Sequence, residues 1–406
     1  MEKLILPCRR GLSGVFGIFW ALVLVTWSPP TPVRGADLFR TVTKSSEKDR
    51  ITKALKDLDA YEAQAWLHSL EQSRIFLEIN RMEEGQATAD SVLPATGEDL
   101  ERTHAMIAKA MQVEKDGGPP AGQTLARAVG EGTLRVLAIE PGNGKEHLRV
   151  TRYYSAKVRA RKKKDKTFSR ALYRLPPESH RDSTGRLPTK QQIHAGVLEG
   201  KAEDIAWLTP LDEAAVQMQG SGLLVFSESE VTSINYEGNN GYPWTDEDEA
   251  AKSQIRREFG EVTMKYWTRY KKRHTFHRHL NLDDFKHLKL LPGQFLGFDK
   301  PFERKMPVTA RVSAAMDPGM IAPASIGLLI SPEGRNRLVK VDDQGAAFID
   351  RPDKIDLFWG SYTRNELQSG MTEDGKPVGI YPDWADLFFL VAARPDQTGV
   401  VPVTTP

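Results

Sequence analysis

The apolar positions in the first part of the chain recur every three or four residues. Such spacing places apolar side chains on one face of a helix. Ser46 and Asp49 form a capping-box pattern at its start, so we predict a helical segment over residues 46–84. Its apolar face consists of Ile51, Leu55, Leu58, Tyr61, Trp66, Leu70 and Phe76.

A second helical pattern begins at another capping box, formed by Thr96 and Asp99. Its apolar face consists of Leu100, His104, Ile107 and Met111. Packing in a core explains both apolar faces, so neither points to a function. Residues 116–122 read Asp-Gly-Gly-Pro-Pro-Ala-Gly and predict a loop or linker.

Beyond residue 122 the pattern changes to short apolar runs separated by Gly, Pro and Asn. Such runs predict the strands of a β-barrel architecture. The predicted strands are 134–139, 148–154, 223–226, 308–312, 326–330, 346–349 and 387–392. We predict one further helix over residues 253–270 and a disordered tail over 394–406.

The first 35 residues have the pattern of an export signal. Lys3, Arg9 and Arg10 precede an apolar run over residues 11–27, and residues 33–35 offer a cleavage site before Ala36. An uncleaved N-terminal anchor is the alternative. We therefore expect an exported, periplasmic protein, which contacts a membrane only if this N-terminus is retained.

The cysteine position and the net charge give no support to two further classes, lipoproteins and nucleic-acid-binding proteins. The single cysteine, Cys8, precedes the apolar run, so the sequence has no lipoprotein attachment site. Lys and Arg total 56 against 54 Asp and Glu, and the formal charge of +2 gives no reason to expect a nucleic-acid partner. Nucleotide-binding loops and the serine-hydrolase elbow are absent from the sequence, and we predict no cofactor.

A histidine cluster and two basic runs are candidate sites for a metal or an anionic ligand. His274, His277 and His279 lack a companion cysteine and the spacing of a zinc helix, so we predict no metal. The basic runs 159–164 and 271–274 fit either an anionic-ligand patch or a solvated end of a strand or helix.

A polar, glycine-rich stretch offers groups that suit sugar hydroxyls. Amides and hydroxyls supply donors and acceptors, and glycine lets a ligand approach the backbone. For each residue alone, a turn or packing role is the favoured interpretation, and only the cluster points to sugar binding. The candidates are Gln217, Gln219, Gly220, Ser221 and Asn240, with Trp207, Trp244 and Trp359 as rings for stacking on sugars.

An acidic residue later in the chain has aromatic neighbours. Asp356 is followed by Leu, Phe and Trp359, and such surroundings remove water from a carboxyl group. Loss of water raises the pKa, so that the group can donate a proton near neutral pH. A purely structural aspartate is the alternative.

Eight segments, taken in order, resemble the motifs of the membrane-bound lytic murein transglycosylase A (MltA) family. The resemblance extends from about Trp66 to Tyr381, and the single motifs gain their weight from the shared order. The segments are Tyr153-Tyr154, 172–177, 187–208, 217–222, 240–243, 313–318, Asp342 and 356–360.

The resemblance implies an α+β protein with a double-psi β-barrel, an inserted second β-domain and a helical N-terminal segment. The implied parts are a signal or anchor (1–35), a helical region with the first part of the barrel (37–152), the insert (153–299), the second part of the barrel (300–393) and the tail (394–406).

The resemblance also implies an activity. The family cuts the β-1,4 bond between N-acetylmuramic acid (MurNAc) and N-acetylglucosamine (GlcNAc) in peptidoglycan and leaves a 1,6-anhydro end. On this chain the catalytic aspartate falls on Asp356 and a supporting aspartate on Asp342. Glycan strands are the expected partner, and proteins of cell-wall synthesis or division are left open. The implied glycan-binding residues are Tyr153, Tyr154, Gln217, Gln219, Gly220, Ser221, Asn240 and Trp359.

Departures from the family pattern leave two other functions open. Ser155 and Ala156 replace an acid and a proline, and the segment after Asp342 lacks a glycine and a lysine of the family motif. A peptidoglycan-binding protein without activity on the same fold is one alternative. A hydrolase of β-1,4 glycans is the other, and it needs a second carboxylate, from Asp342 or Asp317.

Overall fold

The computed structural model describes most of the chain after the N-terminal segment. The described residues are 38–59, 61–84, 93–140, 145–242, 272–280, 295–297, 306–344, 351–379 and 381–394. The predicted signal, the helix over 253–270, the strand over 346–349 and nearly all of the tail lie outside them. Within the described ranges, none of the helices has the length and apolar character needed to span a bilayer.

Four helices precede most of the strands. They are α1 (Ser45–Lys56), α2 (Ala63–Glu84), α3 (Gly97–Lys115) and α4 (Ala121–Gly130). The helical segment predicted over 46–84 is confirmed for most of its length, but it forms two helices because the chain leaves the first at Asp57. Leu58 bridges to Asn336 and the Asp59 amide donates to the Asn336 carbonyl at 2.8 Å, so tertiary pairing interrupts the helix.

The two predicted capping boxes had different outcomes. The box at Thr96 and Asp99 is confirmed, with both reciprocal bonds present. The box at Ser46 is wrong, since α1 begins after Lys44 and no side chain caps it. The sequence reading also missed α4, whose cap is Pro120 within the predicted loop.

Within the part of the chain that the structure describes, eleven strands form one sheet, and six of them close into a ring. The order is β1-β2-β15-β12-β13-β11-β14-β3-β6-β7-β8, and β15 also pairs with β3, which closes the ring from β15 to β3. The ring strands are β3 (Leu148–Arg159), β11 (Ser313–Ala315), β12 (Ile326–Ile330), β13 (Asn336–Asp343), β14 (Lys354–Tyr362) and β15 (Trp384–Ala392). The others are β1 (Phe39–Thr41), β2 (Leu134–Ile139), β6 (Ser221–Val225), β7 (Val231–Asn239) and β8 (Thr275–His279).

Most of the predicted strands are confirmed, some with shifted ends. The strands over 134–139 and 326–330 match β2 and β12 exactly in extent, whereas β3 continues to Arg159. The strand predicted over 308–312 is wrong, because β10 (Met306–Val308) ends where that run begins. It pairs with β9 (Phe295–Gly297), and the chain then turns through Arg311, whose φ is +61°.

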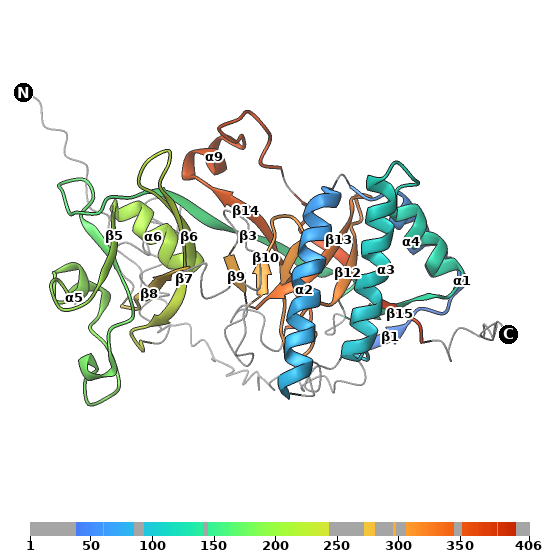
Figure 1. Ribbon diagram of the computed structural model, residues 1–406, viewed down its shortest axis with the longest axis horizontal. Helices are drawn as coiled ribbons and strands as arrows, with labels where there is room; N and C mark the ends of the chain where they lie inside the picture. The colour runs from blue at the N-terminus through green and yellow to red at the C-terminus, as the bar shows by residue number, and fades with distance from the viewer. Residues whose placement is uncertain are drawn as a thin grey trace, which may run out of the picture. The chain divides into compact units, whose positions relative to one another are not determined.

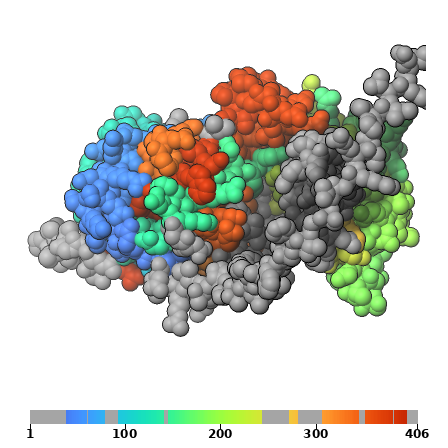
Figure 2. All heavy atoms as spheres, turned by 180° about the vertical axis from the view of Figure 1, so that it is seen from behind, coloured from blue at the N-terminus to red at the C-terminus, as the bar shows by residue number. Residues whose placement is uncertain are grey.

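Two apolar clusters hold this part of the chain together. One draws on alternate residues of the ring strands, such as Val150, Ala314, Ile355 and Leu387. The other joins the four helices to β2, β12 and β15. Figure 1 shows α1 to α4 beside these strands, and in Figure 2 blue atoms from the N-terminal part lie next to orange and red atoms from the other end of the sequence.

A second group of elements is inserted between the ring strands β3 and β11. It contains β4 (Arg170–Tyr173), β5 (Asp204–Leu208), α5 (Lys190–His194), α6 (Pro210–Gln219) and the strands β6 to β8. Strand β3 belongs to both groups: its first half pairs with β14 and β15, and its last residues pair with β6. The candidate site lies along this shared strand.

Candidate active site

Asp356 lies on β14, on the face of the ring that points away from its apolar interior. Its neighbours Ile355 and Leu357 are buried in the ring cluster, so strand alternation turns Asp356 to the other side. In the sheet, Asp356 is opposite Ala315 on β11 and Thr151 on β3. Three strands therefore fix the position of this carboxylate.

The surroundings of Asp356 favour its protonated form. Burial raises the pKa of Asp356 to about 7, because loss of water disfavours the charged carboxylate. The charge of Asp343 raises this pKa further, whereas the Thr151 hydroxyl and the Arg152 guanidinium oppose the rise. One carboxyl oxygen, Oδ1, is buried without a hydrogen-bond partner among the described residues. A carboxyl group in this state can donate a proton at neutral pH.

A register shift decides which aspartate faces Asp356. On β13, Lys340 and Val341 lie opposite Ser313 and Ala314, but Ala315 then pairs with Asp343 and skips Asp342. Such irregularities re-aim side chains beside functional sites. Because Ala315 also pairs with Asp356 on its other side, Asp343 is the acid that the sheet brings toward Asp356.

Asp342, the predicted supporting residue, is fully buried in an ion pair. Its Oδ1 lies 2.6 Å from Nζ of Lys340, and the hydroxyl of Ser313 donates to its Oδ2. Lys340 also donates to Ser73 on α2. Burial raises the pKa of Asp342 and lowers the pKa of Lys340, and each partner's charge opposes the other's shift. The network anchors α2 to β13; a supporting role in catalysis stays a prediction.

Tyr153 forms a hydrogen bond with Asp343 and also lines a pocket. Its hydroxyl donates to Oδ2 of Asp343 at 2.8 Å, and burial together with that carboxylate raises the pKa of Tyr153 well above its usual range. The pocket has a volume of about 500 Å³ and includes Arg152, Tyr153, Tyr154 and Trp359 in its lining. Three of the predicted glycan-binding residues thus line one pocket, and two of its lining residues, Arg152 and Tyr153, interact electrostatically with Asp356.

Trp359 lies deep in the wall of this pocket. Its Nε1 donates to the Val378 carbonyl at 2.8 Å, and the residue is 5% exposed. The guanidinium carbons of Arg311 and Arg337 lie 5.5 and 5.3 Å from the ring centroid. Little of the ring is open to a sugar in this conformation, so stacking on Trp359 stays a prediction.

The end of α6 supplies polar groups next to the tyrosines. Gln219 forms a side-chain hydrogen bond with Tyr154. Ser221 shares a hydrogen bond with Ser155 across β3 and β6, at 2.7 Å between the hydroxyl oxygens. Gly220 ends α6 with a φ of +76°, a conformation that glycine adopts without strain. These three predicted residues therefore lie close to the pocket.

Two other predicted glycan-binding residues are buried and hold the insert together. The Gln217 amide accepts from the Thr275 backbone at 2.7 Å and donates to its carbonyl at 3.0 Å. The Asn240 side chain donates to the Pro188 and Lys272 carbonyls and accepts from the His274 amide, each at 3.0 Å. Both amides are engaged with backbone groups, and contact with a glycan stays a prediction for each.

The structure brings together a different histidine cluster from the one read in the sequence. Oε1 of Glu213 lies 3.3 Å from Nε2 of His194 and 3.9 Å from Nδ1 of His274, without His277 or His279. Lys190 lies 3.7 Å from the other oxygen, Oε2. Burial alone would raise the pKa of Glu213, but Lys190 and His194 bring it down to about 2. The ammonium group balances this carboxylate, so the cluster is accounted for as an ion-pair group.

Sequence reasoning missed Asp343 and Arg152 as parts of the site. Asp343 was passed over because Asp342 was aligned with the family aspartate, and only the register of β11 distinguishes the two. The Asp-Gln-Gly run that starts at Asp343 was a signal for it. Arg152 directly precedes the two tyrosines of the motif, and its position beside them was the signal for it.

Comparison with known proteins agrees with this arrangement. Residues 149–280 match the MltA family model described as the MltA specific insert domain. Membrane-bound lytic murein transglycosylase A of Escherichia coli (strain K12) is 30% identical over 99 residues, which are 24% of this chain and 26% of that protein. The match thus spans about a quarter of the relative's length.

Solved structures show the same fold over most of the chain. The crystal structure of E. coli MltA with bound chitohexaose has a TM-score of 0.56 and 18% identity, covering 88% of this chain and 95% of that one. MltA from Neisseria gonorrhoeae has a TM-score of 0.51 and 16% identity, covering 84% and 90%. At these identities the likeness shows the fold alone.

The chain therefore has the fold of the MltA-type lytic transglycosylases, a strand ring that carries an inserted domain. The insert-domain match covers residues 149–280, and the similarity to the solved MltA structures extends the shared fold over most of the chain.

Proposed function

We propose that this protein is a lytic transglycosylase, which cleaves the β-1,4 bond between MurNAc and GlcNAc in peptidoglycan and leaves 1,6-anhydro ends. The observation that carries the proposal is Asp356, a partly buried carboxyl group whose pKa is raised to about 7 and which interacts with Arg152 and Tyr153 of a tyrosine-lined pocket. Catalytic acids need a pKa near the working pH. The E. coli relative named above supports the class of reaction.

In the proposed reaction one carboxyl group serves twice. Asp356 donates its proton to the glycosidic oxygen, and the bond from that oxygen to C1 of MurNAc breaks. The 6-hydroxyl of the same MurNAc then attacks C1, and its proton passes to the Asp356 carboxylate. The nucleophile is already part of the bound sugar, so proximity replaces the second carboxylate of ordinary glycosidases. No water is consumed, and Asp356 ends in its starting state.

Asp343 assists in this proposal by its charge. A carboxylate beside Asp356 raises the pKa of the acid and stabilises positive charge that develops at C1 in the transition state. The Tyr153 hydroxyl, which donates to Asp343, holds that side chain in place. We also propose that the closed ring of six strands is the double-psi β-barrel expected from the resemblance; the β15–β3 pairing that closes it is the support.

The test is digestion of purified peptidoglycan, with released fragments read by mass spectrometry. The wild-type protein should release fragments lighter by one water than reducing-end fragments, and Asp356→Asn should release none. Asp116→Asn, which removes an exposed carboxylate at the end of α3, is the matched control and should act like wild type. A folded wild-type protein that pellets with peptidoglycan but releases nothing would replace the proposal with a binding protein.

A hydrolase of β-1,4 glycans is the second candidate, and the position of Asp343 favours it. Hydrolysis needs a second carboxylate near the acid, as base or nucleophile. Asp343 fits this role better than Asp342, which is buried with Lys340, because it shares the partner Ala315 with Asp356. Reducing-end products would establish this candidate.

The place of action follows from the substrate. Peptidoglycan lies outside the cytoplasm, so we propose that the chain is exported through the predicted signal over residues 1–35. A fusion of these residues to a reporter that is active only after export tests the point. An inactive reporter would contradict export.

A further inference from the structure

A second pocket lies further along the strand that carries the active-site tyrosines. It has a volume of about 700 Å³, within the range of ligand sites. The three cations in its lining are Lys157, Arg159 and Arg161, at alternate positions of one extended segment. Val158 and Ala160, the residues between them, are buried in the core of the insert, so the three charged side chains share the outer face.

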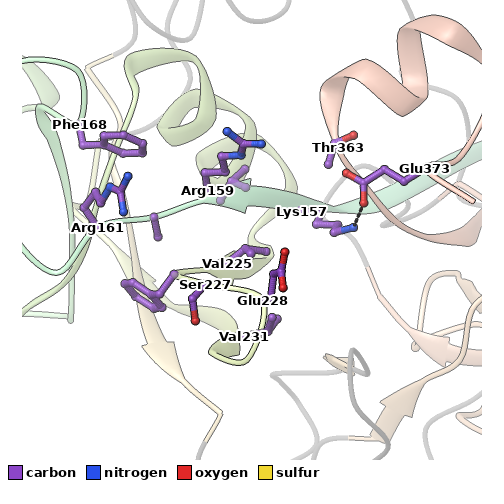
Figure 3. Close-up of a pocket in the computed structure, with 13 residues that line it drawn as sticks. Lys157, Arg159, Arg161, Phe168, Val225, Ser227, Glu228, Val231, Thr363 and Glu373 are labelled. Atoms are coloured by element: carbon purple, nitrogen blue, oxygen red, sulfur yellow. Dashed lines mark hydrogen bonds and ion pairs between the residues drawn. The ribbon is translucent and has the colours of Figure 1, made fainter.

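The three cations differ in whether an acidic residue of the protein already forms an ion pair with them. Lys157 is paired with Glu373, 2.9 Å from Nζ to Oε2, as the dashed line in Figure 3 shows. Arg159 and Arg161 are exposed, and no ion pair between described residues includes either of them. The charge of Arg159 does reach Asp212 on α6 and lowers the pKa of that carboxyl against the larger effect of burial. Two guanidinium groups are therefore available to an anion.

The remaining walls are aromatic and acidic in part. The guanidinium of Arg161 lies over Phe168, with 5.3 Å between its central carbon and the ring centroid, and Figure 3 shows the two side by side. Phe226 and Glu228 come from the loop that joins β6 and β7. Glu228 and Glu373 leave the pocket with three cations against two carboxylates. Such a site suits a ligand with spaced acidic groups on an apolar chain, rather than a densely charged polymer.

The spacing of the arginines fits a peptide. Residues two apart on a strand are separated by about 6.6 Å, the repeat of side chains on one face of another extended chain. Guanidinium groups bind carboxylates through paired hydrogen bonds. An extended acidic peptide that lies beside β3 can therefore place carboxylates opposite Arg159 and Arg161.

The distance to the active site identifies the source of that peptide. Arg159 lies five positions after Tyr154, which lines the first pocket, and is therefore about 17 Å further along the strand. An extended peptide of five residues has about the same reach. Peptidoglycan carries short acidic peptides on its MurNAc residues. A sugar in the tyrosine-lined pocket can thus extend its own peptide to the arginines.

We propose that this second pocket binds the acidic stem peptide of the glycan strand that occupies the active site. The inference rests on the proposed function for its substrate and adds a subsite that recognises the peptide. The protein would then prefer peptide-bearing glycan to bare glycan.

The test compares two substrates and two double variants. The substrates are peptidoglycan glycan strands with their stem peptides and the same strands after removal of the peptides by an amidase. Arg159→Gln with Arg161→Gln removes the subsite. Lys163→Gln with Lys166→Gln removes the same charge from exposed positions outside the pocket and is the control.

We expect the arginine variant to raise KM for peptide-bearing strands by about tenfold or more, from the loss of two charged hydrogen-bonded contacts. The KM of the arginine variant for bare strands should stay within about twofold of wild type. The lysine variant should keep wild-type KM values for both substrates within the same limit. An equal effect on both substrates, or the same effect in the lysine variant, would overturn the inference.

A binding measurement separates this inference from the proposed function. Purified stem peptide is titrated into the full-length wild-type protein and into both double variants by calorimetry. Binding that is lost in the arginine variant alone supports the subsite, even if neither glycan is cleaved. Cleavage of both glycans without any binding of the peptide would leave the proposed function standing and reject the subsite.

Discussion

Asp343 and Asp356 are both sheet partners of Ala315, one on each side of β11. Two strand spacings separate their backbones by about 9–10 Å. At this separation the charge of Asp343 contributes to the raised pKa of Asp356. Burial is the larger cause of the raised pKa of Asp356, and the charge of Asp343 adds to it.

Removal of the neighbouring charge should shift the pH profile. In Asp343→Asn the pKa of Asp356 falls below its wild-type value of about 7, because the neighbouring negative charge no longer disfavours the charged carboxylate. The active form is protonated, so the alkaline limb of the profile moves to lower pH. Tyr153→Phe removes the bonded hydroxyl but keeps the charge, and serves as the comparison. An alkaline limb that stays in place in Asp343→Asn would contradict the coupling.

The raised pKa of Asp356 also predicts how stability depends on pH. The folded protein binds the Asp356 proton more tightly than the unfolded chain, so wild type loses stability as pH rises from about 4 to about 7. Asp356→Asn does not have this loss. Above pH 7 the variant should be more stable by on the order of 2 kcal/mol, roughly half the full linkage value because the group is partly exposed. Urea unfolding at pH 5 and pH 8 measures this, and a difference that is the same at both pH values would contradict it.

Asp342 should matter for stability more than for chemistry. Asp342→Asn leaves the Lys340 ammonium buried without its partner carboxylate, which costs about 3–5 kcal/mol. Replacing both residues, by Asp342→Leu with Lys340→Met, should recover most of that loss because no charge is then buried. Urea midpoints of the single and double variants measure the effect. A single variant that is as stable as wild type would show that the ion pair is not buried as described.

Substitutions of Gln217 and Gln219 should have different effects. The first should lower the stability of the protein, and the second should weaken its binding of glycan. Gln217→Ala removes the hydrogen bonds that tie α6 to Thr275 and should destabilise the protein by about 2–3 kcal/mol. Gln219→Ala should leave stability within about 0.5 kcal/mol and raise KM for glycan, because Gln219 bonds to Tyr154 at the pocket. Thermal unfolding and initial rates on both variants test this pair. Reversed effects would assign Gln217 to the glycan.

The parts of the fold that follow local chemistry could be predicted from the sequence. The Thr96 capping box and the apolar run of β12 depend on residues close together in the chain, and both formed as expected. The break after α1 and the turn at Arg311 depend on contacts with Asn336 and Phe358, far away in the sequence. Periodicity carries no information about such contacts.

The candidate site likewise combines features that the local sequence predicts with features that depend on contacts between distant residues. The apolar and aromatic residues that follow Asp356 predict a desolvated acid from the sequence alone. Which of two adjacent aspartates faces it depends on a one-residue shift between β11 and β13. A shift of one residue turns a strand's side chains over, and the motif alone does not encode it. The burial of Gln217 and Asn240 likewise results from the packing of β8, which the sequence reading did not contain.

The most direct test of a single-acid reaction is digestion of peptidoglycan in water enriched with oxygen-18, with mass spectrometry of the new chain ends. If the 6-hydroxyl of MurNAc is the nucleophile and Asp356 the acid, the new ends are anhydro ends without the label, and Asp356→Asn forms none. New reducing ends that carry the label would show that water attacks C1. The reaction would then be hydrolysis, with Asp343 as the second carboxylate.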